Sequence, residues 1–132
     1  MAFQCVLVTP EQQLLDEKVE QAILPAVDGQ IGILTDRAPL LAKLGLGPLR
    51  IDLQSGQKRF YLVEGGVAQM KDNKLTILTT AATPADEIDA ESARAEYAEA
   101  EARQPTDSAT TEIRKQQMAR ARAKQAVVAA RR

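Results

Sequence analysis

The sequence predicts a β + α protein, with an N-terminal antiparallel β-sandwich of about ten short strands over residues 1–84 and a C-terminal antiparallel two-helix hairpin over residues 85–132. Two observations predict this fold class. Short runs of Val, Ile and Leu alternate with turn residues before Pro84, whereas Ala, Glu, Gln and Arg dominate after it. The first pattern is typical of strands in a sandwich or flattened barrel, and the second is typical of helices.

Turn signals divide the strand region into short segments. Residues 3–9 form the first expected strand, which ends at Pro10 because proline cannot donate to a ladder hydrogen bond. Residues 49–54 alternate strictly between apolar and polar side chains, as in an antiparallel sheet with one buried face. Further strands are expected over residues 12–15, 18–24, 31–34, 36–41, 58–63, 67–70 and 75–80. Turns are expected at residues 16–17, 28–29, 45–48, 55–56, 65–66 and 72–73.

The first helix is expected over about residues 88–103. Asp86 is its expected N-cap, and acidic residues follow in the first turns, where the helix dipole stabilises negative charge. Pro105 then interrupts the helical pattern, because a proline in a helix interior costs about 3 kcal/mol.

The second helix is expected to begin at a cap formed by Asp107 or Ser108 and to run through Val128. The apolar stripes of both helices consist almost wholly of Ala, which has a high helix propensity but buries little area. We therefore expect a hairpin that is only marginally docked and can open. The stripe residues are Ala93, Ala98, Ala100 and Ala102 on the first helix and Ala119, Ala123 and Ala126 on the second.

Charge is separated along the chain, although the formal net charge is only −1. Residues 1–87 carry 8 basic and 11 acidic side chains, residues 89–103 carry two and five, and residues 107–132 carry seven and two. The small net charge gives no global attraction to nucleic acid or anionic lipid. An acidic helix followed by a basic helix suggests a module that holds one partner and extends an arm towards another.

The composition argues against catalysis. The absence of His removes the commonest general base and zinc ligand, and the single Cys, Cys5, is expected to be a small buried hydrophobe in the first strand. The acidic residues are scattered and form no obvious carboxylate pair. The start of the chain does not resemble a secretory leader, and no apolar run approaches about 20 residues. We therefore expect a protein that is not secreted and that reaches a membrane only through another protein.

The basic side chains near the C-terminus are open to three interpretations. They could form a solvated helix face, a nucleic-acid patch or a docking surface for an acidic protein segment. No aromatic side chains are interleaved to stack on bases, which disfavours nucleic acid. The residues are Arg114, Lys115, Arg120, Arg122, Lys124, Arg131 and Arg132.

Several stretches together resemble one known family. A Gly-x-x-Gly-Ile turn and strand ahead of Ala-Pro-Leu occupies residues 29–41. Matching segments follow at residues 47–51, 65–66 and 75–78, with others at 8–14 and 88–89. In combination they resemble the epsilon subunit of F-type ATP synthases, called delta in mitochondria, over essentially the whole chain. The resemblance implies the same sandwich and hairpin that the residue patterns predict.

The resemblance also implies a function. The family's epsilon subunit is a non-catalytic rotor component of the central stalk, which couples proton-driven rotation to ATP synthesis and inhibits ATP hydrolysis through its basic C-terminal helix. The implied partners are the gamma subunit, the c-ring and, transiently, the alpha/beta catalytic head, without a cofactor or metal. The implied location is peripheral, on the cytoplasmic face of the bacterial inner membrane or at a thylakoid or other energy-transducing membrane.

Matching positions imply roles for individual residues of the sandwich. Thr9 and Arg37 are expected to face gamma, and the turn formed by Gly29, Gln30 and Ile31 is expected to face the c-ring. Arg37 stands where the family usually has His, so a pH-sensitive role of that His is lost here, while a contact role can survive.

Other positions imply roles for the helices. Arg114, Arg120 and Arg122 are expected to approach acidic segments of the catalytic subunits. Some relatives bind ATP between the folded helices through Ile-Asp-x-x-Arg-Ala, a motif that Ile88, Asp89 and Ala93 match in part. Ser92 replaces its Arg, which removes a strong phosphate ligand. An ATP-sensing switch is nevertheless the first alternative function, and a free-standing nucleic-acid or scaffold-binding module is the second.

Overall fold

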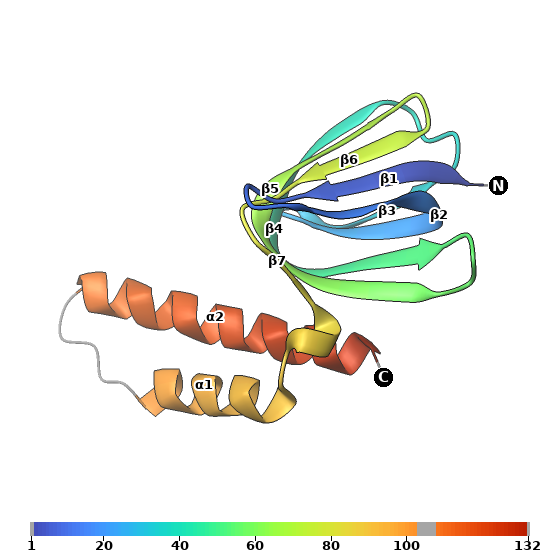
Figure 1. Cartoon of the computed structure of the whole chain (residues 1–132). Coiled ribbons are helices and arrows are strands. Elements are labelled where there is room, and N and C mark those ends of the chain that lie inside the picture. Colours follow the sequence, from blue (N-terminus) through green and yellow to red (C-terminus); the bar gives the residue numbers. More distant parts are fainter. Residues whose placement is uncertain (1, 103–107, 132) are drawn as a thin grey trace.

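The computed structural model describes residues 2–102 and 108–131. Within them a β-sandwich of seven strands precedes a helical hairpin (Figure 1), which confirms the predicted fold class. The strands are β1 (Phe3–Val8), β2 (Gln13–Ala26), β3 (Gly29–Leu34), β4 (Leu40–Leu53), β5 (Lys58–Lys71), β6 (Lys74–Leu78) and β7 (Ala82–Pro84). The helical segments are η1 (Ala85–Glu87), α1 (Ala90–Ala102) and α2 (Ser108–Arg131).

The strands are fewer and longer than the sequence predicts. β2, β4 and β5 each span 14 residues and run through the breaks expected at residues 16–17, 45–48 and 65–66. The glycines in β4 mark a close approach between strands instead of a turn, because a Cβ at Gly47 would lie 2.9 Å from the Cβ of Pro25. Three long strands therefore take the place of several predicted short ones.

Strand pairing closes the sandwich into a flattened barrel. β1, β6, β5, β4 and β2 pair in that order, and β1 also pairs with β2, while β3 and β7 extend from β2 and β5. The β1–β6 pair is parallel, and the others are antiparallel. Closure leaves these five strands without a free edge, which protects them from pairing with other chains.

The barrel interior is filled by the alternating apolar side chains. The expected alternation in β4 is confirmed, since Leu49, Ile51 and Leu53 are buried while Arg50 and Asp52 are partly exposed. The largest fully buried side chains of this core are Phe3, Leu7, Val19, Leu24, Ile33, Leu49, Ile51, Val63, Met70, Leu75 and Ile77.

Cys5 belongs to this core, as predicted, and is fully buried. Burial, and secondarily the charge of Asp16, raises the pKa of the Cys5 thiol to about 12. The side chain therefore stays a neutral thiol near neutral pH and acts as a packing group, without the thiolate character that cysteine chemistry requires.

The Gly65-Gly66 pair forms a corner inside β5. Gly65 has a φ of 82° and Gly66 a φ of 128°, conformations that side chains with a Cβ rarely adopt. Hydroxyl groups that follow β6 fix this corner: Thr79 donates to the carbonyl oxygens of Gly65 and Ala81, and Thr80 donates to that of Glu64. The corner separates the part of β5 that pairs with β7 from the part that pairs with β6.

The first α-helix begins later than the sequence predicts. Ala85–Glu87 forms a 3₁₀ turn, which contains the expected cap Asp86, and Ile88 then returns to extended backbone. The N-cap of α1 is instead Asp89, whose carboxylate accepts hydrogen bonds from the Glu91 backbone N–H (3.1 Å) and the Ser92 hydroxyl (2.9 Å). Asp86 was therefore the wrong cap, because the chain needs an extra turn after β7 before it enters the helix. Of the two expected caps of the second helix, Asp107 lies outside the described residues, and Ser108 is the first residue of α2.

α2 lies between the sandwich and α1 (Figure 1), and its packing differs from the predicted alanine stripes. On α1, Ala93 and Ala100 are buried, but Ala98 and Ala102 are exposed because they lie on other sides of the helix. Among the α2 side chains that the structure describes, Ala121 and Val127 are buried; they lie about 120° apart around the helix and so serve two contacts. Of the predicted α2 stripe, Ala123 is partly buried, whereas Ala119 and Ala126 are exposed.

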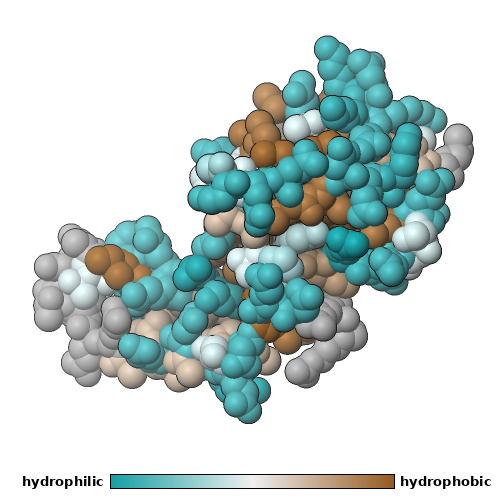
Figure 2. All heavy atoms as spheres, viewed as in Figure 1, coloured by the Kyte–Doolittle hydropathy of each residue, from teal (hydrophilic) through white to brown (hydrophobic). Residues whose placement is uncertain are grey.

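Hydrophobic residues are unevenly distributed on the surface. In the space-filling view strongly hydrophobic residues gather on the sandwich, while the helices show mostly hydrophilic or weakly hydrophobic ones (Figure 2). The sandwich therefore offers apolar contact area to a partner, and the helices offer mainly polar groups.

Replacing Gly66 with Ala is expected to destabilise the fold by about 2 kcal/mol or more. The added Cβ would lie 2.2 Å from the carbonyl oxygen of Leu78 and 2.7 Å from the Cα of Thr79. Gly32→Ala is a matched control, because nothing lies within 4 Å of its added Cβ, and its effect should stay within about 0.5 kcal/mol. Urea unfolding measures both variants, and equal midpoints would contradict the tight fit at Gly66.

The cap of α1 makes a prediction about pH. The Ser92 hydroxyl and then the Glu91 N–H stabilise the Asp89 carboxylate and hold its pKa below the ordinary value of 3.8. A depressed carboxyl pKa stabilises the helix start above a pH of about 4, and this contribution is lost as the pH falls through the folded-state pKa. An NMR titration should place the Asp89 midpoint below 3.8, and Ser92→Ala should raise it. No change in the Ser92→Ala variant would show that the hydroxyl does not stabilise the charge.

Candidate functional site

The candidate site is the docked helical arm, defined here as α1 and α2 together, and the sandwich surface on which α2 rests. A second small hydrophobic cluster, separate from the barrel core, anchors the arm through Leu62 of β5, Ala85 of η1 and Val127 of α2. Phe60 and Ile88 pack against it from the side. Because so few side chains take part, this cluster stabilises docking far less than the barrel core stabilises the sandwich.

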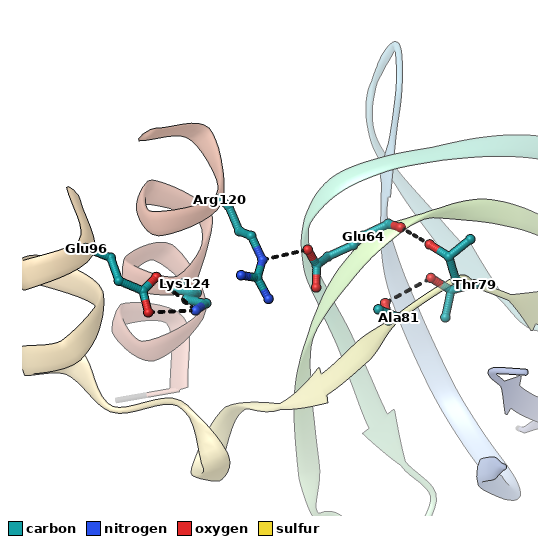
Figure 3. A network of polar contacts seen from close by, with 7 residues as sticks. Glu64, Thr79, Ala81, Glu96, Arg120 and Lys124 are labelled. Atoms are coloured by element: carbon teal, nitrogen blue, oxygen red, sulfur yellow. Dashed lines mark hydrogen bonds and ion pairs between the residues drawn. The ribbon is translucent and has the colours of Figure 1, made fainter. Parts of the chain in front are cut away.

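An ion pair connects α2 directly to the sandwich. The Arg120 Nε lies 2.8 Å from the Glu64 Oε1, and Glu64 stands at the end of the corner described above (Figure 3). A second pair joins the two helices, where the Lys124 Nζ lies 2.9 Å from the Glu96 Oε2 (Figure 3). Partly exposed pairs of this kind stabilise a contact only modestly and weaken with salt.

The other two predicted arginines also make contacts within the arm. Arg114 donates to the backbone oxygens of Ala100 (3.1 Å) and Glu101 (2.9 Å), which lie in the last turn of α1. Arg122 donates to the Tyr97 hydroxyl (2.8 Å), and its guanidinium lies 5.4 Å from the centroid of the Tyr97 ring, a cation–π distance. In the folded arm all three predicted arginines are therefore engaged inside the chain.

The residues of the partial nucleotide motif are brought together. Ile88, Asp89 and Ala93 line one hollow of about 290 Å³ between the start of α1 and α2. Its two cations, Arg120 and Lys124, already face the carboxylates of Glu64 and Glu96. The remaining lining residues are Thr83, Glu87, Ser92 and Glu96.

Several side chains around this hollow already form hydrogen bonds or ion pairs within the protein. The Ser92 hydroxyl donates to Asp89 and so belongs to the helix cap. Asp89 and Glu87 add negative charge to the lining, which opposes a polyanionic ligand. The hollow thus lies where the partial nucleotide motif predicts a ligand, but its lining carries three acidic and two basic side chains.

The predicted gamma-facing residues lie on the sandwich. Thr9 is buried, and its hydroxyl donates to the carbonyl of Gln12 (3.1 Å), so it shapes the turn after β1. Arg37 follows Asp36, which is tied to the β5–β6 turn by two hydrogen bonds with Asn73 of 2.8 and 2.9 Å. This tie places Arg37 next to the turn between β5 and β6.

An apolar patch lies on the outer face of the neighbouring strands β1, β6, β5 and β4. Leu78 of β6 pairs with Val8 of β1 on one side and with Val67 of β5 on the other, and all three side chains reach the surface. Leu41 of β4 lies diagonal to Val67 across the ladder and is 71% exposed. We call Val8, Leu41, Val67 and Leu78 the outer patch. Large exposed apolar groups in adjacent strands are typical of a protein interface.

The residues of the predicted c-ring turn are the first three of β3, directly after the turn at Val27 and Asp28 that joins β2 to β3. Gly29 has a φ of 121°, and both Gly29 and Gln30 are exposed, whereas Ile31 is partly buried and packs against the barrel core. The Val27 N–H donates to the carbonyl of Lys43 (3.0 Å), which fixes the turn to β4. The turn therefore presents polar backbone on a rigid support.

Sequence reasoning missed the acidic and aromatic partners of the arginines. Glu64, Glu96 and Tyr97 complete the contacts of the arm, and nothing in their local sequence identifies them. The one available signal was the glycine pair beside Glu64, since adjacent glycines often mark a backbone conformation that other residues rarely adopt.

No helix in the described part of the chain is long and apolar enough to span a bilayer.

Comparisons with known proteins agree on one family. Residues 2–85 match the family described as ATP synthase, Delta/Epsilon chain, beta-sandwich domain. The ATP synthase epsilon chain of Rhodopirellula baltica is 42% identical, over 76% of this chain and 77% of its own length. The ATP synthase epsilon chain of Gloeobacter violaceus is 37% identical, over 93% and 92%.

Solved structures extend the likeness to both parts of the chain. A chain in the cryo-EM structure of Euglena gracilis mitochondrial ATP synthase (OSCP/F1/c-ring, rotational state 1) superposes with a TM-score of 0.86 at 25% identity, covering 92% of this chain and 78% of that one. A chain in the central stalk and c-ring structure of Tetrahymena thermophila mitochondrial ATP synthase shares the fold, with a TM-score of 0.70 at 18% identity and 95% coverage of both chains. The chain therefore belongs to the delta/epsilon chain family of ATP synthases.

Proposed function

We propose that this protein is the epsilon subunit of an F-type ATP synthase, a non-catalytic part of the central stalk. Its sandwich (residues 1–84) would bind gamma and the c-ring, and its hairpin (residues 85–132) would be a regulatory arm. The observation that carries this proposal is the match of both parts to ATP synthase epsilon chains and to a chain of an F1/c-ring complex. In this role the subunit transmits proton-driven rotation to ATP synthesis.

The gamma contact is proposed for the outer patch. This face of the sandwich lies beside Thr9 and near Arg37, and it is not covered by the arm, whose α2 packs on β4, β5 and η1 around Leu62. Burying Leu41, Leu78 and their neighbours against gamma would remove apolar surface from water and stabilise the complex. Arg37 would add a permanently charged contact at the edge of that surface.

The c-ring contact is proposed for the Gly29-Gln30-Ile31 turn. Its exposed backbone and its attachment to β4 suit it to hydrogen bonding with polar loops. Through the c-ring the subunit would be held peripherally at an energy-transducing membrane, on the cytoplasmic face in a bacterium.

The inhibitory role is proposed for the basic helix α2. Arg114, Arg120 and Arg122 would leave their present partners and pair with acidic segments of the alpha/beta catalytic head, so that the extended arm blocks ATP hydrolysis. The contacts that hold them now are partly exposed and polar, which keeps the exchange energetically small.

An ATP-sensing switch is the second candidate, and the hollow beside Ile88, Asp89 and Ala93 is the observation that favours it. The replacement of the motif's Arg by Ser92 and the carboxylates around the hollow weigh against it. Calorimetric titration of the isolated protein with ATP separates the two candidates, since binding at millimolar ATP would support the switch.

A charge introduced into the outer patch is expected to disrupt gamma binding. Leu78→Glu should weaken binding of gamma about tenfold or more, because a carboxylate would be desolvated in an apolar interface. Ile113→Glu on α2 is a matched control, since Ile113 is 51% exposed and Leu78 is 54% exposed. Titration with gamma measures both variants. If both variants lose the same affinity for gamma, or if Leu78→Glu loses none, gamma does not bind at the outer patch.

Removal of the arm is expected to raise ATP hydrolysis. A chain that ends at Pro84 should still assemble with gamma, while the enzyme that contains it hydrolyses ATP several-fold faster because the inhibitory helix is gone. A full-length variant with Ala at Arg114, Arg120 and Arg122 should change hydrolysis in the same direction, and it retains the helix that packs on Leu62. Failure of the truncated chain to bind gamma would show that the two parts do not divide the functions in this way.

A further inference from the structure

The ion pair between Glu64 and Arg120 connects the arm to the sandwich, whereas the other polar contacts described above connect the two helices to each other. The pairs Lys124–Glu96 and Arg122–Tyr97 join α2 to α1, so they can persist when the hairpin moves as a unit. The Arg120–Glu64 pair, at 2.8 Å, joins α2 to β5 of the sandwich and has to break when the arm leaves.

The sandwich holds Glu64 in a fixed position. Its backbone N–H donates to the carbonyl of Ala81 (3.0 Å), and its carbonyl oxygen accepts from the Thr80 hydroxyl. The following residues, Gly65 and Gly66, form the corner fixed by Thr79. Because the backbone is already ordered, pairing with Arg120 costs only side-chain entropy on the Glu64 side.

The two partners also differ in exposure. The Glu64 side chain is 23% exposed, whereas that of Arg120 is 52% exposed. A partner segment can therefore reach the guanidinium while Glu64 is still paired with it. Breaking the pair without replacement leaves a partly buried carboxylate unpaired, which opposes spontaneous release.

We propose that Glu64 is a built-in acidic surrogate that occupies Arg120 and latches the arm to the sandwich. Release of the arm is then an exchange, in which an acidic protein segment takes over Arg120 from Glu64. This inference rests on the proposed function, because it names what the regulatory arm must give up before it can reach an acidic partner.

The latch is tested by hydrogen exchange of the isolated full-length protein. Glu64→Gln keeps the size of the side chain but removes its charge, and it should accelerate exchange of the α2 amides near Arg120 and Val127 about two- to fivefold. Raising KCl should bring the wild type closer to this variant, because salt screens the pair. Glu96→Gln is the matched control, since it removes an ion pair within the arm. It should accelerate amide exchange on α1 and α2 alike, and this acceleration should be the same whether or not Arg120 is present.

A double-mutant cycle separates the latch from general loosening. Glu64→Gln and Arg120→Gln should each accelerate exchange, and the double variant should be no faster than either one, since both remove the same interaction. The swap of Glu64→Arg with Arg120→Glu should restore part of the protection. Additive single effects, or a Glu64→Gln variant that exchanges like the wild type, would overturn the latch.

The acidic partner is tested with a defined probe. A decapeptide of alternating Glu and Asp should accelerate α2 exchange in the wild type, and it should bind Glu64→Gln more tightly because its competitor is gone. Equal binding to both proteins would overturn the surrogate role. In the reassembled ATP synthase, Glu64→Gln should lower ATP hydrolysis. An opened arm with unchanged hydrolysis would reject the proposed inhibition while leaving the latch intact.

Discussion

The close approach of β5 to β6 at Gly66 is the constraint on which the rest of the structure depends. Only a residue without a Cβ fits against the carbonyl of Leu78, and this fit lets one strand of 14 residues pair with β7 before the corner and with β6 after it. Because β5 turns there, the barrel can close through β1 and β2. The same corner directs Glu64 away from the barrel core and towards α2.

The chain contains two hydrophobic clusters of very different size, and their separation sets an order of stability. The barrel core includes residues from the first six strands, whereas the docking cluster of the arm is centred on Leu62, Ala85 and Val127. Burial scales with apolar area, so the sandwich persists under conditions in which the arm detaches. Under the proposed function, the sandwich would make the permanent contacts and the arm the exchangeable ones.

The sequence was sufficient where local patterns decide the structure. The alternation of residues 49–54 and the tight turn at Asp72 and Asn73, with φ values of 52° and 57°, both follow from neighbouring residues. Strand length did not follow, because a glycine signals a turn and a close strand crossing equally well. The number of strands was therefore overestimated although the fold class was right.

The contacts of the arm could be predicted only in part. The resemblance singled out Arg114, Arg120 and Arg122, but their partners lie between 13 and 56 residues away along the chain. Ion pairs and cation–π contacts between distant residues depend on how α2 rests on the sandwich, and no local pattern encodes that placement. The cap at Asp89 was missed for a related reason, since the 3₁₀ turn before it follows from the route out of β7.

The cover that Val127 provides for Leu62 has a consequence for when the arm can move. Leu62 is fully buried beneath α2, so lifting the helix wets Leu62 and part of Phe60 beside it. Water opposes that exposure, and a subunit alone in solution is thereby driven back to the closed form. Where another protein surface shields the bared leucine again, opening costs less, so the hydrophobic effect favours opening in a complex over opening in solution.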